Sequence, residues 1–525
     1  MTPRAAALLE VLQSPQRDAV EQGLALLESL GDDPIAAELE AALSSIFTRQ
    51  VAGSWLRLQQ SSDSRGAFRS ARQIWGWMCG RPGWLGTQLQ SAGATRLALS
   101  CYDLVSFPPS TGLEALEVLR LEDTSSLEDI GSLAALPRLW SLSISGRARA
   151  DLAPLACMPG LRELSVRGVD LDDLRLLEGM AGLSLLSLSR GRIGSLAGLE
   201  RLPLRELTLS GCTGFADLAP LRGLTGLVSL HLKACDDLAS VDALAGLDGL
   251  ERLSLNRLPL LHALPAVGRL ERLWSLSLDN LPVEEVDAVG ALPALRSLSL
   301  RRCEALVRLP VAVGLQHLVL YSCKGVTDLS PLRGAGLRTL ELAGLKQVSD
   351  FSVLSSCASL TQLTLKSLPG LTDLSALRGL AALAELSCGR CGLRSLDGLP
   401  TESLSSLQIL RCAQLGSLEG LAAAGALRFL SINWCGGVDD TRFVSSLASL
   451  ETLLLQSTAI WELGERWDTP ALRSVHLSQN RFLEDISGLS GLPSLRLLGI
   501  EDCPRLRHAA IRPLADAMPG CKITT

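Results

Sequence analysis

The sequence has little of what catalysis and cofactor binding usually require. Its 525 residues include five histidines and two tyrosines, and aromatic residues make up 4% of the chain. It contains no GxxxxGKS, GxxxxGKT, HExxH or GxSxG motif and no GxGxxG that follows a strand, so the common signatures of nucleotide binding, zinc proteases and serine hydrolases are missing. We therefore expect a protein that is not an enzyme and that has no cofactor and no metal site.

The sequence also lacks a basic excess and a membrane segment. Lysine and arginine number 49 against 55 acidic residues, which gives a formal net charge of −6. This balance argues against a general binder of nucleic acids or membrane surfaces. No run of 18 uninterrupted apolar residues exists, and Glu10 interrupts the short apolar stretch after Arg4, so no secretory signal is recognisable. We expect a cytoplasmic monomer that contacts no membrane.

What the sequence does have is one short repeated motif, LxxLxL, with apolar residues at its first, fourth and sixth positions. Nineteen repeats of it begin at Ala94, Leu116, Leu139, Leu161, Leu183, Leu204, Leu227, Leu250, Leu273, Leu295, Leu315, Leu337, Leu360, Leu383, Leu404, Leu427, Leu450, Leu472 and Leu495. These residues span 401 positions in 18 intervals, a period of about 22. A fixed period of this length is typical of a solenoid, whose repeats must stack because none can bury its apolar side alone. We number positions from the first residue of each repeat.

The alternation of apolar and polar residues within the motif predicts one short strand per repeat. Leu142 and Ile144, at positions 4 and 6, alternate with serines, which is the period-two pattern of a half-buried strand. The rest of each repeat must return the chain to the same edge of a parallel sheet. In the segment Asp328–Leu332, we expect Ser330 to cap and Pro331 to begin a short helical turn on the opposite side.

This repeat resembles that of leucine-rich repeat proteins and is nearest to the short, internalin-like repeats of bacteria. The resemblance implies an α/β solenoid, a curved array of about 19 parallel strands with an α-helical N-terminal cap. It divides the chain into a helical N-terminal cap at 1–90, the leucine-rich repeat solenoid at 91–507 and a C-terminal cap at 508–525. The excess of arginine over lysine and the abundance of leucine, alanine and glycine are typical of a high-GC bacterial genome.

The two ends of the chain lack the LxxLxL motif and are predicted to cap the array. Helical patterns cover Ala5–Leu12, Pro15–Leu30, Pro34–Leu58 and Gly66–Met78 at the start, and a helix at His508–Met518 precedes a half-strand at Cys521–Ile523 at the finish. Four tryptophans gather near the first strands: Trp55, Trp75, Trp77 and Trp84. They either fill the core of the cap, because an exposed leucine ladder needs an apolar cover, or they form a binding cage.

Cysteine is common at position 9, where related repeats usually carry asparagine. Asn480 is the one asparagine there, and cysteine takes the position in Cys212, Cys235, Cys303, Cys323, Cys391, Cys412, Cys435 and Cys503, which resembles the cysteine-containing class of these repeats. A small, weakly polar side chain fits the turn pocket in which asparagine bonds backbone groups. We therefore predict free thiols. We interpret Cys388 and Cys391 as a core residue and a pocket residue rather than as half of a zinc or redox site.

The residues displayed between the leucines are the candidates for function. Position 5 is serine or threonine in ten repeats, namely Ser143, Ser165, Ser187, Thr208, Ser254, Ser277, Ser299, Thr364, Ser387 and Ser431. This floor of small hydroxyl groups is either a consequence of crowding on a curved sheet or a surface that lets a partner's backbone approach closely.

Positions 7 and 8 carry a second pattern, which we call the basic stripe. From the fourth repeat to the fifteenth they hold nine basic residues against one acid, Asp279: Arg167, Arg190, Lys233, Arg257, Arg301, Arg302, Lys366, Arg390 and Arg411. Tyr321 and Trp434 stand near the stripe, and acids at these positions gather at the two ends, in Glu122, Asp123, Glu501 and Asp502. The stripe either keeps a sheet edge soluble or docks an acidic protein surface, because arginine and aromatic residues dominate binding energy at interfaces.

These patterns predict a non-enzymatic scaffold for protein–protein interaction whose partner presents an acidic surface to the concave face. Two alternatives stay open. One is a sensor or regulatory subunit of a separately encoded enzyme or of a defence or signalling complex. The other is binding of an RNA backbone by the basic stripe, which would show as a steep salt dependence of affinity.

Overall fold

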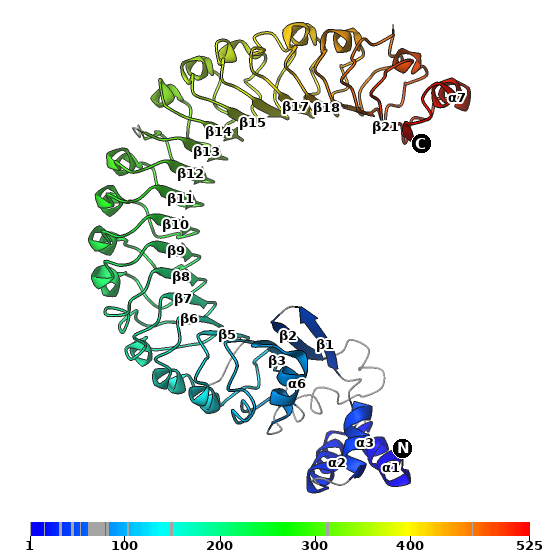
Figure 1. Cartoon of the computed structure of the whole chain (residues 1–525). Helices are drawn as coiled ribbons and strands as arrows, with labels where there is room; N and C mark the ends of the chain where they lie inside the picture. Colours follow the sequence, from blue (N-terminus) through cyan, green and yellow to red (C-terminus); the bar gives the residue numbers. More distant parts are fainter. Residues whose placement is uncertain are drawn as a thin grey trace. The chain divides into compact units, whose positions relative to one another are not determined.

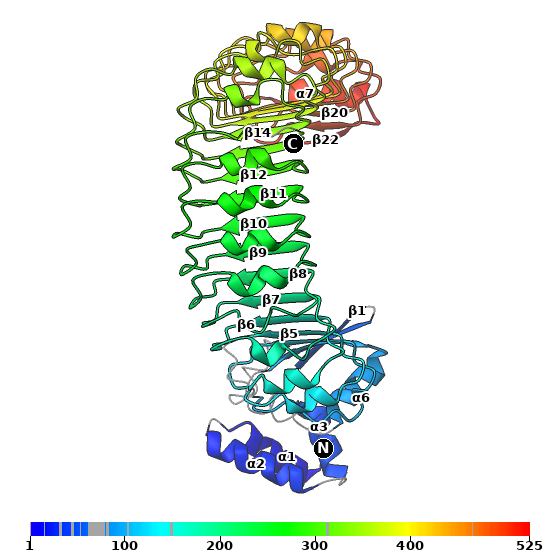
Figure 2. The same ribbon diagram turned by 90° about the vertical axis from the view of Figure 1, so that its left-hand side faces the viewer.

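The computed structural model describes all residues except 1, 15, 31–33, 44–46, 53, 61–78, 80–82, 102–103, 147–150, 311–313 and 465. It contains two compact units, Met1–Leu250 and Glu251–Thr525. In each unit the repeat strands lie along one side and short 3-10 helices lie along the other (Figure 1; Figure 2). In the described part of the chain, no helix is long and apolar enough to cross a membrane.

The first unit begins with three helices, α1 (Pro3–Leu12), α2 (Arg17–Ser29) and α3 (Pro34–Leu43). The first two confirm the helices predicted in this region. In α2, Val20, Leu24 and Leu27 are buried, as expected for residues that recur on one face of a helix.

A β-hairpin follows α3, so the helix predicted at Pro34–Leu58 is wrong from Phe47 onward. Strand β1 (Phe47–Ala52) pairs antiparallel with β2 (Trp55–Gln60), and β2 pairs parallel with the first repeat strand. Leu56 and Leu58 are fully buried, and the exposed Arg57 lies between them, which is the period of a strand and not of a helix. Because the two leucines are in register with Leu97 and Leu99, the hairpin adds a rung to the leucine ladder and caps it.

The tryptophan cluster is only partly within the described residues. Trp84 is the first residue of α6 (Trp84–Ala92), and Trp55 is the first residue of β2. Trp75 and Trp77 lie outside the described residues, as does the helix predicted at Gly66–Met78. The choice between a cap core and a binding cage therefore stays a prediction.

The nineteen repeats give nineteen strands, each of which starts two residues after the first residue of its repeat. The first unit holds β3 (Arg96–Ser100), β4 (Val118–Glu122), β5 (Ser141–Ser145), β6 (Glu163–Arg167), β7 (Leu185–Ser189), β8 (Glu206–Ser210) and β9 (Ser229–Lys233). The second unit holds β10 (Arg252–Asn256), β11 (Ser275–Asp279), β12 (Ser297–Arg301), β13 (His317–Tyr321), β14 (Thr339–Ala343), β15 (Gln362–Lys366), β16 (Glu385–Gly389), β17 (Ser406–Leu410), β18 (Phe429–Asn433), β19 (Thr452–Gln456), β20 (Ser474–His476) and β21 (Leu497–Gly499).

Within each unit these strands are parallel and in register, so equivalent leucines stack on one another. Leu298 at position 4 lies opposite Leu276 in the preceding strand and Leu318 in the following one, and all three are buried. Burial of each such side chain is worth roughly 1.5–3 kcal/mol. The ladder of leucines is therefore the continuous core that the repeat predicts.

Short 3-10 helices return the chain on the opposite side of the strands. They are η2 (Gly131–Ala135), η3 (Ala153–Cys157), η4 (Arg175–Leu177), η5 (Ala219–Gly223) and η6 (Asp242–Gly246) in the first unit. The second unit has η7 (Pro265–Arg269), η8 (Asp287–Ala291), η9 (Ser330–Leu332), η10 (Ser352–Ser356), η11 (Ser375–Leu377), η12 (Glu419–Ala423), η13 (Arg442–Ser446) and η14 (Ser487–Leu489).

The prediction that Ser330 is the cap is wrong, because Leu329 is the N-cap of η9, and an aspartate one residue before the N-cap bonds the start of several of these turns. The carboxylate of Asp328 accepts hydrogen bonds from the backbone N–H of Ser330 at 2.7 Å and from its hydroxyl at 2.6 Å. Asp350 and Asp373 accept the N–H two residues further on in the same way, at 2.8 and 2.9 Å. An aspartate that bonds the backbone two residues later forms its own turn. The predicted helical turn is present, and Pro331 is its second residue, after Ser330.

The second unit ends in the helix and half-strand that the sequence predicts. Helix α7 (His508–Ala517) precedes β22 (Lys522–Thr524), and β22 pairs parallel with β21. Leu514 is the buried residue of the helix. The last repeat strand is therefore covered along its edge by one more short strand.

Candidate binding surface at the ends of the repeat strands

The face of the strands opposite the leucine core is lined by the residues that the repeat leaves variable. In β12, Leu298 and Leu300 are buried while Ser297, Ser299 and Arg301 are half-buried. The position-5 hydroxyl groups are half-buried throughout the ten repeats, except that of Ser431, which is buried. The floor of small hydroxyl groups therefore exists, and it lies below the longer side chains of positions 7 and 8.

Position 8 has a backbone conformation that the sequence analysis missed. Its φ is positive in all eighteen repeats from Leu116 onward, and in the non-glycine residues it lies between 50° and 63°. The left-handed turn lets the N–H of this residue extend the ladder: that of Arg302 donates to the carbonyl of Tyr321 at 2.7 Å, and that of Arg390 donates to Leu410 at 2.8 Å. The signal was present, because glycine recurs at this position, as at Gly344.

This turn exposes the large position-8 side chains at the ends of their strands. Arg190, Arg257, Arg390, Arg411 and Trp434 occupy the position and are exposed. A left-handed conformation costs a non-glycine residue roughly 1–2 kcal/mol. Non-glycine residues at position 8 therefore expose their side chains at a cost in backbone stability.

Position 9 is a buried pocket, as predicted. The Nδ2 of Asn480 donates to the carbonyl groups of Leu455 and Leu477, at 2.6 and 2.7 Å. The thiol of Cys323 reaches the equivalent carbonyl of Leu300 at 3.4 Å, and other pocket cysteines contact the same group of their preceding repeats. Cysteine thus keeps the contact with the preceding repeat's carbonyl, and all 14 cysteines are free thiols.

The CxxC pair occupies the two positions assigned to it. Cys388 is fully buried in the core of β16, and Cys391 is 7% exposed in the pocket. Burial raises the pKa of the Cys388 thiol well above its ordinary value. Among the described residues, no three histidine, cysteine, aspartate or glutamate side chains come together in a way that could hold a metal ion.

The structure distributes the basic stripe over both units. Arg167, Arg190 and Lys233 are exposed in the first unit. Arg167 and Arg190 line the same cavity as Glu122 and Asp123, two of the acids that the sequence places at one end of the array. The remaining members of the stripe lie in the second unit.

Two basic residues of the second unit are paired with acids. Arg302 binds Asp279 through both carboxylate oxygens, with Nε to Oδ1 at 2.9 Å and Nη2 to Oδ2 at 2.7 Å. The carboxylate raises the pKa of Arg302 by hydrogen bonding and by its charge. Lys366 lies 3.8 Å from Glu341, an acid at position 5 that a count of positions 7 and 8 overlooks. The stripe is thus less positive than the sequence suggested.

Two other arginines stack on aromatic rings. The guanidinium carbon of Arg301 lies 5.8 Å from the ring centre of Tyr321, and that of Arg411 lies 5.3 Å from the ring centre of Trp434. The Nε of Arg301 also donates to the hydroxyl of Ser299 at 3.1 Å. Tyr321 and Trp434 remain 41% and 49% exposed, so each stack presents a ring and a charge to solvent.

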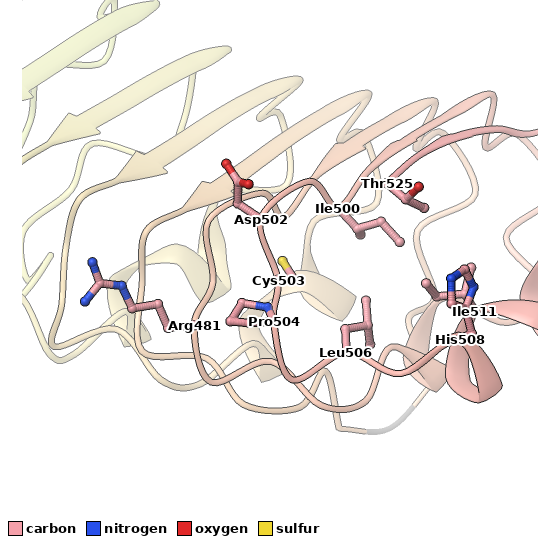
Figure 3. A pocket seen from close by; sticks show the side chains of 9 residues that line it. All are labelled: Arg481, Ile500, Asp502, Cys503, Pro504, Leu506, His508, Ile511 and Thr525. Atoms are coloured by element: carbon pink, nitrogen blue, oxygen red, sulfur yellow. The ribbon is translucent and has the colours of Figure 1, made fainter.

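A separate cavity of about 520 Å³ lies between the last repeat and α7. Figure 3 shows its lining, in which Ile500, Leu506 and Ile511 provide apolar surface and Arg481 and Asp502 stand on the side of the repeat. None of the stripe residues lines it. It therefore lies at the C-terminal cap, away from the basic stripe.

Comparison with known proteins identifies the fold. No protein-family model and no curated protein sequence matches the chain. Among solved structures, a complex of TLR13 with a single-stranded RNA shares 20% identity, covers 83% of this chain and 79% of its own, and superposes with a TM-score of 0.58. An internalin of Listeria monocytogenes has 21% identity, covers 65% of this chain and 87% of its own, and has a TM-score of 0.40.

A leucine-rich repeat protein of Leptospira interrogans shares 16% identity, with coverage of 82% of this chain and 95% of its own and a TM-score of 0.44. At such identities a likeness shows a shared fold and nothing about ligands. The fold is that of a leucine-rich repeat solenoid, as the LxxLxL period and the parallel strands indicate.

Proposed function

We propose that this chain is a non-enzymatic binding scaffold that docks an acidic protein surface on the strand face of its second unit. The observation that carries the proposal is the pair of exposed stacks, Arg301 on Tyr321 and Arg411 on Trp434. Arginine, tyrosine and tryptophan are the residues most enriched among those that dominate binding energy at protein interfaces. The monomeric state and the cytoplasmic location predicted from the sequence belong to this proposal.

The stacks are suited to binding because they are ordered before a partner arrives. A guanidinium held over a ring, and in the case of Arg301 also by Ser299, has less side-chain freedom to lose on complex formation. Immobilising a flexible side chain otherwise costs roughly 0.5–1.5 kcal/mol. A carboxylate of the partner would meet the oriented N–H donors of the guanidinium group beside an apolar ring face.

The paired members of the stripe have a supporting role in this proposal. Asp279 and Glu341 already neutralise Arg302 and Lys366 in part. Exposed ion pairs of this kind contribute about 0–1 kcal/mol each. Specificity for an acidic surface would therefore rest on Arg301 and Arg411, which form no ion pair with any described residue.

The test is a charge reversal at the two stacked arginines. The double variant Arg301→Glu with Arg411→Glu should weaken binding of a captured partner by about 2–5 kcal/mol, because two acids would face an acidic surface on desolvation. The measurement is affinity capture from a lysate of the organism that encodes the chain, followed by titration of the purified partner against each variant at two salt concentrations.

The control is Asp328→Lys, which reverses a single charge just before η9, on the 3-10 side of the same unit. It should leave the affinity for the partner unchanged. The fold of the double variant should also survive, because substitutions on the surface usually change stability by about 0.5 kcal/mol or less. Native melting together with full, salt-independent binding by the double variant would contradict the proposal.

Two other functions are outcomes of the same experiment. A single-stranded RNA oligonucleotide serves as a competitor, because the structure of TLR13 that this chain resembles in fold is a complex with such an RNA. Competition with a steep logarithmic dependence on salt would assign the stripe to RNA backbone. A captured partner that is itself an enzyme would instead make this chain its sensor or regulatory subunit.

A further inference from the structure

A cavity of about 560 Å³ opens at the ends of four consecutive strands of the first unit, β4 to β7. It is lined by residues at positions 7 and 8 of their repeats: Glu122, Asp123, Ser145, Gly146, Arg167, Gly168 and Arg190. Glu122 ends β4 and Asp123 follows it, whereas Arg167 ends β6 and Arg190 follows β7. Small residues at the end of β5 separate the acidic end of the cavity from the basic end.

The hollow is a consequence of two glycines at position 8. Elsewhere in the array this position displays side chains as large as Arg411 and Trp434, whereas Gly146 and Gly168 display none. A side chain could not be added freely at Gly146, because a Cβ there would lie 2.6 Å from the backbone nitrogen of Thr124. The glycines at position 8 therefore keep the space between the two charged ends of the cavity open.

The opposite charges are held apart rather than paired. Neighbouring strands of a sheet lie about 4.8 Å apart, so β4 is roughly 10 Å from β6 and roughly 14 Å from β7. Glu122 forms an ion pair with Arg57 at 2.9 Å. Asp123, Arg167 and Arg190 form no ion pair with any described residue. All three side chains are exposed and available to a ligand that spans the hollow.

We propose that this cavity binds an extended peptide segment that carries one basic and one acidic side chain four residues apart. In an extended chain these two side chains point to the same side and are separated by roughly 13 Å, at about 3.3 Å per residue. The basic side chain would meet Asp123 beside Glu122, and the acidic one would meet Arg167 and Arg190. This ligand differs from the acidic surface proposed for the second unit, and neither proposal depends on the other.

The first test uses the whole chain and a labelled nine-residue peptide, Gly-Ser-Lys-Ser-Ala-Ser-Glu-Ser-Gly, together with the same peptide with lysine and glutamate exchanged. Fluorescence anisotropy gives the dissociation constants, and the tighter of the two is the reference. Replacing either charged residue by glutamine should raise the dissociation constant about threefold, since an exposed charge contact is worth up to about fivefold in affinity. Shortening the spacing from four residues to two should have a similar effect.

The second test changes the cavity without changing its charge. Gly168→Asn places a side chain in the hollow, and asparagine tolerates the positive φ of 78° at this position. We expect at least a threefold loss of affinity for the reference peptide. The charge-reversed variant Arg167→Glu with Arg190→Glu should lose the reference peptide and instead prefer a peptide with lysine at both positions.

Arg222→Glu in η5 is the control, because Arg222 is exposed on the 3-10 side of the same unit. It should bind the reference peptide as the unaltered chain does, and thermal melting checks that every variant is folded. Equal affinity for the reference peptide and its glutamine analogues would overturn the proposal, as would unchanged affinity of the Gly168→Asn variant.

Discussion

At the scale of single residues, one backbone conformation explains how this chain displays its charged groups. From the second repeat onward the residue at position 8 is left-handed, and in most of these repeats its N–H stays in the hydrogen-bond ladder. Glycine adopts this conformation without strain, yet arginine, serine and tryptophan also occupy the position. The backbone conformation alone would favour glycine at position 8. The larger residues found there place a side chain on the surface at a cost in backbone strain.

Substitution of Arg390 tests this explanation. Arg390 has a φ of 53°, and its N–H donates to Leu410 at 2.8 Å. Arg390→Gly should change the free energy of unfolding by less than about 0.5 kcal/mol, because relief of strain offsets the greater freedom of glycine in the unfolded chain. Arg390→Val should lower stability by about 1–2 kcal/mol, because a β-branched residue is a severe outlier in this conformation.

Both variants remove the same guanidinium, so their difference isolates the backbone. Chemical denaturation measures the two free energies. Equal stability of the glycine and valine variants would show that position 8 is not held in the left-handed region in solution.

The cysteines give a second prediction at this scale. Burial raises the pKa of Cys235 and of Cys323 to about 12, so almost no thiolate forms there at neutral pH. In the folded protein we expect the exposed Cys157 to react rapidly with a disulfide reagent and the buried pocket thiols to react only on unfolding. Recovery of 14 thiols from unreduced, denatured protein is the expected total, and a clear shortfall would mean that disulfides exist.

At the scale of elements, the aspartates that precede the 3-10 turns make the stability of these turns depend on pH. Hydrogen bonds from Ser330, Ser352 and Ser375 lower the pKa of Asp328, Asp350 and Asp373 below the ordinary value of about 3.9. A carboxyl group whose pKa is lower in the folded state stabilises that state above its unfolded pKa. The contribution is lost as the pH falls through the folded pKa.

The triple variant Asp328→Asn, Asp350→Asn and Asp373→Asn should therefore show a smaller fall in melting temperature between pH 5 and pH 2 than the unaltered chain. Asparagine can form the same turn without a titrating group, so the turns are kept while the titration is removed. Melting curves at a series of pH values provide the measurement. Parallel pH profiles for the two proteins would mean that these carboxylates do not contribute.

The elements also show how far the sequence could predict the structure. The strands followed from LxxLxL because buried residues at positions 4 and 6, mostly leucine, carry the period of a strand in every repeat. The hairpin was missed because Leu56 and Leu58 match only positions 4 and 6 of the LxxLxL motif. They also lie in a stretch whose apolar residues have the spacing of a helix. The aspartate turns and the ion pairs were missed for another reason: Asp328 binds through a local turn, and Glu341 reaches Lys366 from the neighbouring repeat.

The surface shows the same limit. The sequence located the exposed residues of the basic stripe, because their positions in the repeat fix which face they occupy. It did not predict that Arg302 pairs with Asp279 or that Arg411 stacks on Trp434. Those contacts depend on the rotamers of long side chains in adjacent repeats, which the period does not determine.

At the scale of the whole molecule, a repeat protein is stabilised by contacts between neighbours, and the ends need separate cover. In the first unit the hairpin places Leu56 and Leu58 on the first repeat strand, and in the second unit β22 covers the last one. Every interior rung has two neighbours. Damage to one rung should therefore weaken the repeats on both sides of it.

Leu298→Ala in the second unit tests this coupling. Leu298 is 2% exposed and stacks between Leu276 and Leu318, so its truncation leaves a cavity and should cost about 2–5 kcal/mol. Hydrogen exchange followed by mass spectrometry should show faster exchange in β11 and β13 as well as in β12, because each strand relies on its neighbours for burial. Ser299→Ala on the opposite face of β12 is the control and should leave the exchange of β11 and β13 unchanged. Exchange that accelerates in β12 alone would show that these repeats unfold independently, and the picture of a coupled ladder would fail.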